Sequence, residues 1–135
     1  MRYSIPVVQV LLGLIFLFFG LNGFFGFLQA PLPAGAAGDF LGAMLKSHYV
    51  YMVSGVQVLA GLLLLVNQFV PFALALLAAM LANILTFHVT MEPTGAPLAV
   101  VTTILWLILA WKFRACFRPL FVRKAQQSSV IRRGE

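Results

Sequence analysis

The sequence predicts an all-α integral membrane protein in which four helices form an up-down-up-down bundle. Three observations predict this fold class. The 135 residues are 62% hydrophobic and 9% charged, whereas soluble globular domains have about 45–50% apolar and about 25% charged residues. The apolar residues form four long runs, with a mean hydropathy of +1.02 over the chain, and most basic residues follow the last run. We therefore expect lipid, rather than water, to surround most of the chain.

The first apolar run, residues 5–28, contains no charged residue. It exceeds the roughly 20 residues that cross a bilayer, and signal-peptide cores are only about 7–15 residues long, so we expect a retained transmembrane helix. One seam of this helix, at steps of four and three, carries Gln9, Gly13, Phe16, Gly20 and Gly23. Because helices in lipid associate through small residues and interhelical hydrogen bonds, this seam is expected to face protein.

The second and third runs cover residues 49–67 and 69–89 and are separated by a tight turn at Asn67 and Gln68. The second run aligns Ser54, Gln57 and Gly61 on one face. The third run carries a stripe of small residues at Ala75, Ala78, Ala79, Ala82 and Thr86. These faces are expected to converge inside the bundle.

The fourth run covers residues 97–115, after a break at residues 91–95. Pro97 fits the first turn of a helix, and the side chains of Lys112 and Arg114 are expected to extend to the membrane interface. Residues 1–118 are therefore predicted to form the membrane domain, and residues 119–135 a basic tail.

The distribution of charge predicts that both termini are cytoplasmic, since basic residues gather on that side of membranes. On the side of the termini lie Arg2, Lys112, Arg114, Arg118, Arg123, Lys124, Arg132 and Arg133. Only Lys46 lies on the other side. The long first loop then faces outward, and Asp39 is expected to cap a short interfacial helix over residues 40–46. The net charge of +6 is explained by topology, so no nucleic-acid partner is predicted.

Polar residues within the spans are candidates for a binding site, because they are costly in lipid. Those expected to lie in the outer half of the bundle are Asn22, Ser54, Gln57, Asn83, Thr86 and His88, with Thr102 and Thr103 approaching from the fourth span. The functional interpretation is a pocket that opens away from the cytoplasm. The structural interpretation is that these side chains only form hydrogen bonds between helices.

The residues present exclude several chemistries. The central parts of the spans have no acidic or basic residue, which argues against a proton-coupled exporter. The sequence has no catalytic Ser-His-Asp set, no phosphate-binding glycine loop and no metal-ligand cluster, and Cys116 has no second cysteine to pair with. His48 and His88 could serve as axial haem ligands only if they faced each other. A neutral, amide-lined pocket suits a neutral amphipathic molecule, such as a lipid or a quinone.

Three segments combine apolar residues with a few polar ones: residues 13–23 (GLIFLFFGLNG), residues 57–65 (QVLAGLLLL) and residues 83–88 (NILTFH). Together they resemble the DoxX family of small four-span bacterial membrane proteins. The resemblance implies a four-helix bundle in the prokaryotic cytoplasmic membrane. Some members of the family are associated with thiosulfate:quinone oxidoreductase or terminal oxidase complexes, and others with oxidative-stress assemblies. Members often carry a glutamate where this sequence has Gln57, a departure that argues against proton-linked chemistry.

The sequence therefore favours an accessory membrane protein, not an enzyme on its own, that binds a lipid-like or quinone-like molecule. Two alternatives stay open: a membrane subunit of a quinone-linked oxidoreductase with a soluble partner, and a structural or chaperone-like membrane protein. Assembly into a homo-oligomer is also left open.

Overall fold

The structure is a computed structural model, and it describes residues 3–28 and 31–124. Every element of secondary structure within these residues is helical. Three helices are long and apolar enough to cross a membrane, or up to four if the bent pair α2 and α3 counts as one span. The predicted all-α class is therefore confirmed.

Helix α1 (Ser4–Phe25) is the first candidate span. It ends earlier than the predicted residue 28, because Gly26 adopts a left-handed conformation with φ 65° and donates its N–H to the carbonyl oxygen of Asn22. Glycine adopts this conformation without the steric cost that other residues incur. The hydropathy of the run, which continues through Phe27 and Leu28, gives no sign of this stop.

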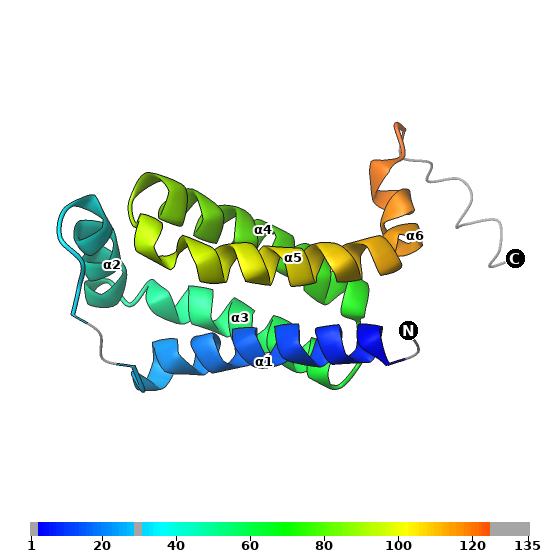
Figure 1. Cartoon of the computed structure of the whole chain (residues 1–135), viewed down its shortest axis with the longest axis horizontal. Coiled ribbons are helices and arrows are strands. Elements are labelled where there is room, and N and C mark those ends of the chain that lie inside the picture. The colour runs from blue at the N-terminus through cyan, green and yellow to red at the C-terminus, as the bar shows by residue number, and fades with distance from the viewer. Residues whose placement is uncertain (1–2, 29–30, 125–135) are drawn as a thin grey trace, which may run out of the picture.

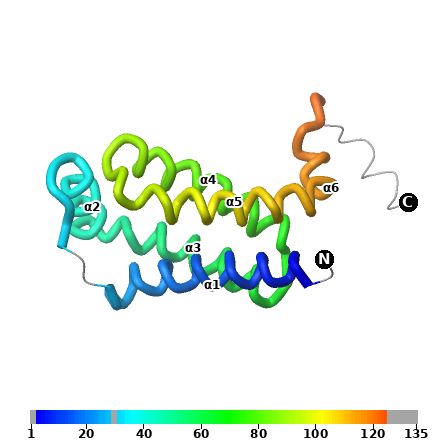
Figure 2. The backbone as a smooth tube through the Cα atoms, in the orientation of Figure 1, coloured from blue at the N-terminus to red at the C-terminus, as the bar shows by residue number. Residues whose placement is uncertain are grey.

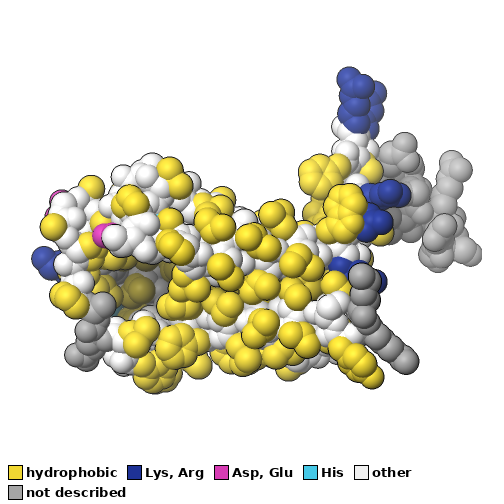
Figure 3. All heavy atoms as spheres, viewed as in Figure 1, with side chains coloured by type: hydrophobic (Ala, Val, Ile, Leu, Met, Phe, Trp, Pro, Cys, Tyr) yellow, Lys and Arg dark blue, Asp and Glu magenta, His cyan; other side chains and the backbone are white. Residues whose placement is uncertain are grey.

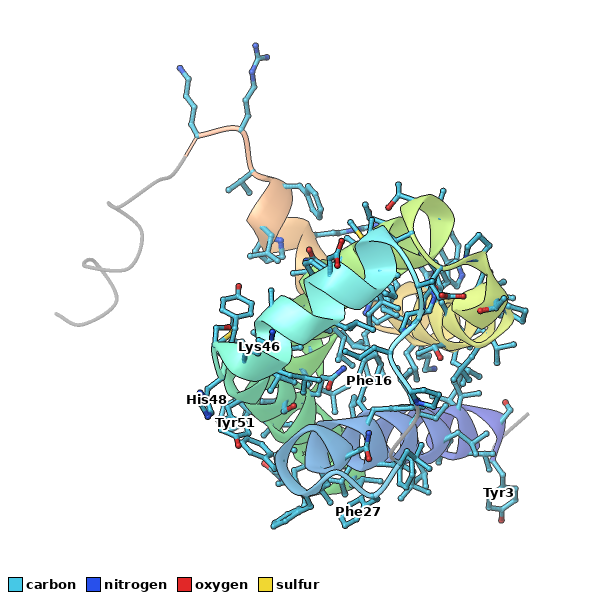
Figure 4. All side chains as sticks on the ribbon, turned by 90° about the vertical axis from the view of Figure 1, so that its left-hand side faces the viewer. Tyr3, Phe16, Phe27, Lys46, His48 and Tyr51 are labelled. Atoms are coloured by element: carbon cyan, nitrogen blue, oxygen red, sulfur yellow. The ribbon has the colours of Figure 1, made fainter. Side chains whose placement is uncertain are left out.

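Helix α3 (Val50–Leu65) packs along α1. The residues of α1 that are buried are Gln9, Leu12, Gly13, Phe16 and Gly20. Four of the five residues of the predicted seam are therefore buried, and the fifth, Gly23, is half-buried. The two backbones approach closely, since a Cβ added to Gly20 would lie 2.8 Å from the backbone nitrogen of Val58. Figure 4 shows Phe16 pointing from α1 into the interior, where it is 2% exposed.

Helix α4 (Val70–Thr90) buries a different face from the one predicted. Its buried residues are Val70, Ala73, Leu74, Leu77 and Leu81, whereas Ala75, Ala79, Ala82 and Thr86 are exposed. The prediction that the small-residue stripe packs inside is therefore wrong. The leucine face and the small-residue face have the same helical spacing, and the larger side chains fill the space between α4 and its neighbours.

Helix α5 (Ala96–Lys112) follows the short 3-10 helix η1 (Pro93–Gly95). It packs against α4 and α1, and the indole N–H of Trp106 donates to the carbonyl oxygen of Leu74 at 2.9 Å. The helix stops at Lys112 rather than at the predicted residue 115. A short turn, α6 (Arg114–Phe117), and a second 3-10 helix, η2 (Arg118–Phe121), follow, and residues 125–135 of the predicted tail lie outside the described residues.

Helix α2 (Ala36–Lys46) lies across one end of the molecule (Figure 1). Its N-cap is Gly35, so the predicted cap at Asp39 is wrong. Asp39 instead lies in the first turn, where its carboxylate interacts favourably with the helix dipole. The axis bends by 86° between α2 and α3, at a break where His48 has a left-handed φ of 63°. The Phe40 ring lies 5.7 Å from the Phe87 ring, which attaches α2 to the end of α4.

Candidate ligand-binding cavity

A cavity of about 470 Å³ lies at the α2 end of the molecule. Its wall is formed by α1, α3, α4 and α5, together with Leu41 of α2. Most of the lining is apolar, and it includes Ile15, Phe16, Phe19, Val50, Val53, Leu81, Ile84, Leu98 and Ala99. Figure 3 shows the surface hollowed at this end, between α1 and α5. The volume falls in the range of about 300–1,000 Å³ typical of small-molecule sites.

Four of the six predicted site residues line this cavity: Asn22, Ser54, Gln57 and His88. They come from α1, α3 and α4, and Thr102 joins them from α5. The structure thus brings together residues that are up to 80 positions apart in the sequence (102 − 22 = 80).

Asn83 and Thr86 lie elsewhere, on the exposed face of α4. The amide of Asn83 donates to the carbonyl oxygen of Ala79 at 2.9 Å, and the hydroxyl of Thr86 donates to that of Ala82 at 2.8 Å. Both bonds stay within the helix. The structure therefore does not bring these two residues to the cavity, although they were expected at the same depth as the others.

Asn22 has a structural role at its position on the cavity wall. Its side-chain oxygen accepts a hydrogen bond from the backbone N–H of Leu28 at 2.7 Å, and its backbone oxygen accepts one from Gly26. Both bonds satisfy the end of α1, where helical carbonyls and the following amides need partners. The side-chain NH₂ of Asn22 makes no hydrogen bond within residues 3–28 and 31–124.

Gln57 provides a complete side-chain amide to the cavity wall. Its side chain is half-buried, and it forms no hydrogen bond to any residue that the structure describes. Thr102 differs, because its hydroxyl donates to the carbonyl oxygen of Leu98 at 2.8 Å. Ser54 is 2% exposed and packs against Gly23, so it offers a much smaller accessible surface than Gln57. The Gln57 amide therefore retains its donors and its acceptor for a molecule inside the cavity.

His88 lies at the edge of the cavity, near the end of α4. Its Nδ1 atom lies 2.9 Å from the carbonyl oxygen of Glu92. The ring also lies over Gly95, where a Cβ would approach Nδ1 to 2.7 Å. These contacts fix the orientation of the imidazole from two sides.

The two histidines do not meet. His48 is exposed, its ring lies 5.5 Å from that of Tyr51, and Figure 4 shows both on the outside of the molecule. It is not among the residues of the cavity wall, so the structure offers no pair of facing axial ligands within its described ranges. Across residues 3–28 and 31–124, no group of three or more His, Cys, Asp or Glu residues could hold a metal ion.

Leu41 and Gly95 complete the wall of the cavity and were not predicted from the sequence. Leu41 belongs to the predicted interfacial helix, and Gly95 to the predicted break between the third and fourth runs. The fold brings both to the cavity wall and places Gly95 beside the His88 ring, and no local pattern in the sequence indicates this arrangement.

No protein-family model matches the chain, and comparisons with curated proteins and with solved structures find no similar protein. A function therefore has to be inferred from the cavity, the helices around it and the distribution of charge.

Proposed function

We propose that this chain is an accessory multi-pass membrane protein that binds a neutral, lipid-like or quinone-like molecule in the cavity. The observation that carries the proposal is the Gln57 amide, which has no described hydrogen-bond partner and lines an apolar cavity of about 470 Å³. The amide atoms are accessible, since no side-chain nitrogen or oxygen that is shielded from solvent in residues 3–28 and 31–124 lacks a partner. A bound molecule can therefore donate to and accept from this amide.

The absence of charge in the cavity favours a neutral ligand. None of the described residues that line it is Asp, Glu, Lys or Arg. An anionic or cationic ligand would lose its hydration there without gaining a counter-ion, which is strongly unfavourable. An amphipathic molecule with a small polar group and an apolar tail matches a lining of this kind.

We further propose that α1, α3, α4 and α5 span the membrane as an up-down-up-down bundle. The backbone trace supports this order, because α1 and α4 run in one direction and α3 and α5 in the other (Figure 2). Helix α3 has 16 residues and is about 24 Å long, at about 1.5 Å per residue, somewhat less than the bilayer core. With α3 along the membrane normal, the 86° bend turns α2 into the plane of the membrane surface, as an interfacial helix requires.

The distribution of charge supports cytoplasmic termini in a prokaryotic cytoplasmic membrane. Figure 3 shows Lys and Arg side chains gathered at the α6 end and acidic side chains at the opposite end. The exposed basic residues at the α6 end are Lys112, Arg114, Arg118, Arg123 and Lys124. Under the positive-inside rule this end faces the cytoplasm, and the cavity then lies in the outer half of the bundle.

The DoxX-like assignment is part of the same proposal. Each of the three segments that carry the resemblance contributes one polar residue to the cavity wall: Asn22, Gln57 and His88. The resemblance therefore falls on the residues that surround one cavity, rather than on apolar segments alone.

Mass spectrometry of the protein purified in a mild detergent tests the proposal. The organic extract should contain one neutral amphipathic species in about equal amount to the protein and enriched over bulk lipid. A soluble oxidoreductase that co-purifies in fixed ratio would favour the alternative role as a quinone-linked subunit. An extract with only bulk lipid, and no second chain, would favour the structural role and contradict the proposal.

A further inference from the structure

His88 lines the cavity, and one of its two ring nitrogens has a defined partner. Its Nδ1 atom lies 2.9 Å from the carbonyl oxygen of Glu92. A carbonyl oxygen can only accept a hydrogen bond, so Nδ1 must carry the hydrogen that is donated. In a neutral imidazole the other ring nitrogen, Nε2, then has no hydrogen and is an acceptor.

Turning the ring by 180° would place Cδ2, which cannot donate a comparable hydrogen bond, opposite the Glu92 carbonyl, so this hydrogen bond favours the orientation in the structure. Gly95 lies beneath the ring, and a Cβ at that position would approach Nδ1 to 2.7 Å and Nε2 to 3.2 Å. On another side, the ring of Phe87 lies 5.2 Å away with an angle of 76° between the two planes. The Glu92 carbonyl therefore holds the donor side of the imidazole toward the chain, and Gly95 and Phe87 pack against the ring.

The acceptor Nε2 has no partner within the described parts of the chain. No residue in 3–28 or 31–124 forms a hydrogen bond to it. Every side-chain nitrogen or oxygen in these ranges that is shielded from solvent has a partner, so the unpaired Nε2 is accessible. Because His88 is half-buried and lines the cavity, Nε2 is open to a ligand.

We infer that the ligand of this cavity carries a hydroxyl group that donates a hydrogen bond to Nε2 of His88. The inference rests on the proposed function, since it describes the molecule bound in the same cavity. A ketone, an ether or an ester can accept from the amide of Gln57 but has nothing to donate to His88. A neutral alcohol or phenol with an apolar tail satisfies both residues, so the cavity selects hydroxyl-bearing amphipaths over otherwise identical molecules without the hydroxyl hydrogen.

A matched pair of probes tests the inference. 4-Octylphenol and its methyl ether, 4-octylanisole, share the ring and the tail, but only the phenol has a hydrogen to donate. Binding of each probe to the full-length protein in a mild detergent is measured by equilibrium dialysis. We expect the phenol to bind about tenfold more tightly than the ether. The bound ether would cover Nε2 of His88 without donating a hydrogen bond to it.

Substitutions at the two histidines show whether His88 is responsible. His88→Phe should reduce the phenol-to-ether ratio to about one, mainly by weakening the phenol. His88→Gln, whose side-chain oxygen can accept, should retain part of the preference. His48→Phe should leave the ratio unchanged, because His48 lies outside the cavity wall. Partition of the probes into detergent is the same for all four proteins, so the change in the ratio reports the site.

The outcomes separate this inference from the proposal on which it rests. Equal binding of the two probes to the unaltered protein would overturn the hydroxyl donor and leave the cavity as a binding site. A preference that survives His88→Phe would overturn the role of His88. Failure of both probes to bind would contradict the proposed function itself.

Discussion

Gly61 of α3 lies directly against the backbone of α1 at Gly13. A Cβ built on Gly61 would lie 2.8 Å from the carbonyl oxygen of Gly13, and a Cβ built on Gly13 would lie 3.1 Å from the carbonyl oxygen of Gly61. Both residues are buried. Without a hydrophobic driving force in lipid, such close backbone contact is a principal source of helix association. This pair therefore holds together the two helices that form one side of the cavity.

Gly61→Ala should destabilise the protein by about 1–3 kcal/mol, because the added methyl group meets backbone atoms that cannot move aside. Gly55→Ala is the matched control on the same helix, since a Cβ at Gly55 meets nothing within 4 Å. That change should be neutral or stabilising by up to about 1 kcal/mol, from helix propensity. Thermal unfolding of both variants in mild detergent measures the difference, and equal effects would contradict the packing described here.

Gln9 connects α1 to the end of α3 through its side-chain amide. The Nε2 atom donates to the carbonyl oxygen of Leu64 at 2.8 Å and to the side-chain oxygen of Asn67 at 3.1 Å. Gln9→Leu should lower the free energy of unfolding by about 0.6–1.7 kcal/mol, the range measured for polar contacts between membrane helices.

The control for Gln9 is Asn83→Leu, which removes an amide that bonds only within its own helix. Denaturant titration in mixed micelles, followed by circular dichroism, should show a smaller change for this variant. A larger loss for Asn83→Leu than for Gln9→Leu would mean that the exposed face of α4 is buried by a partner.

Gln57 and Asn83 have the same side-chain chemistry, apart from one methylene, but lie in different places. Gln57→Leu should reduce retention of the bound molecule at least about fivefold, since loss of one hydrogen bond costs about 1 kcal/mol. Asn83→Leu should leave retention unchanged, because Asn83 is not part of the cavity wall. Quantitative mass spectrometry of the extracts compares them, and equal retention by Gln57→Leu and the unaltered protein would argue against the site.

Membrane orientation can be measured with cysteine labelling. The chain has a single cysteine, Cys116, which is exposed in α6. In intact spheroplasts a membrane-impermeant thiol reagent should leave Cys116 unlabelled and should label a Cys116→Ser/Ala34→Cys variant, whose new thiol lies in the loop before α2. Labelling of Cys116 without permeabilisation would place the α6 end outside and reverse the proposed topology.

Much of the fold follows from patterns that act over a few turns of helix. The apolar runs predict the helices, and the small and polar seam of α1 identifies its buried face, because both depend on spacing along one helix. The residues at which helices end are harder to predict from spacing. The stop of α1 depends on one glycine with φ 65° within a run that remains apolar beyond it.

The candidate site could be predicted only in part, for a physical reason. Position along each predicted span suggested which polar residues could meet, and Asn22, Ser54, Gln57 and His88 do line one cavity. The direction in which a side chain points also depends on the rotation of the helix about its axis, which packing decides. In α4 the face with Leu74, Leu77 and Leu81 is buried, so Asn83 and Thr86 lie on the exposed face.

The measurement that tests the central claim most directly is native mass spectrometry of two proteins released from mild detergent. One is the unaltered protein, and the other is a variant in which a larger side chain occupies the cavity. Val53 lines the cavity wall, and Val53→Trp should occupy part of its volume without adding charge. The unaltered protein should carry one bound neutral molecule per chain, and Val53→Trp, with the same helical circular dichroism, should lose it. A molecule retained equally by both proteins, or none bound to either, would contradict the assignment of this cavity as the binding site.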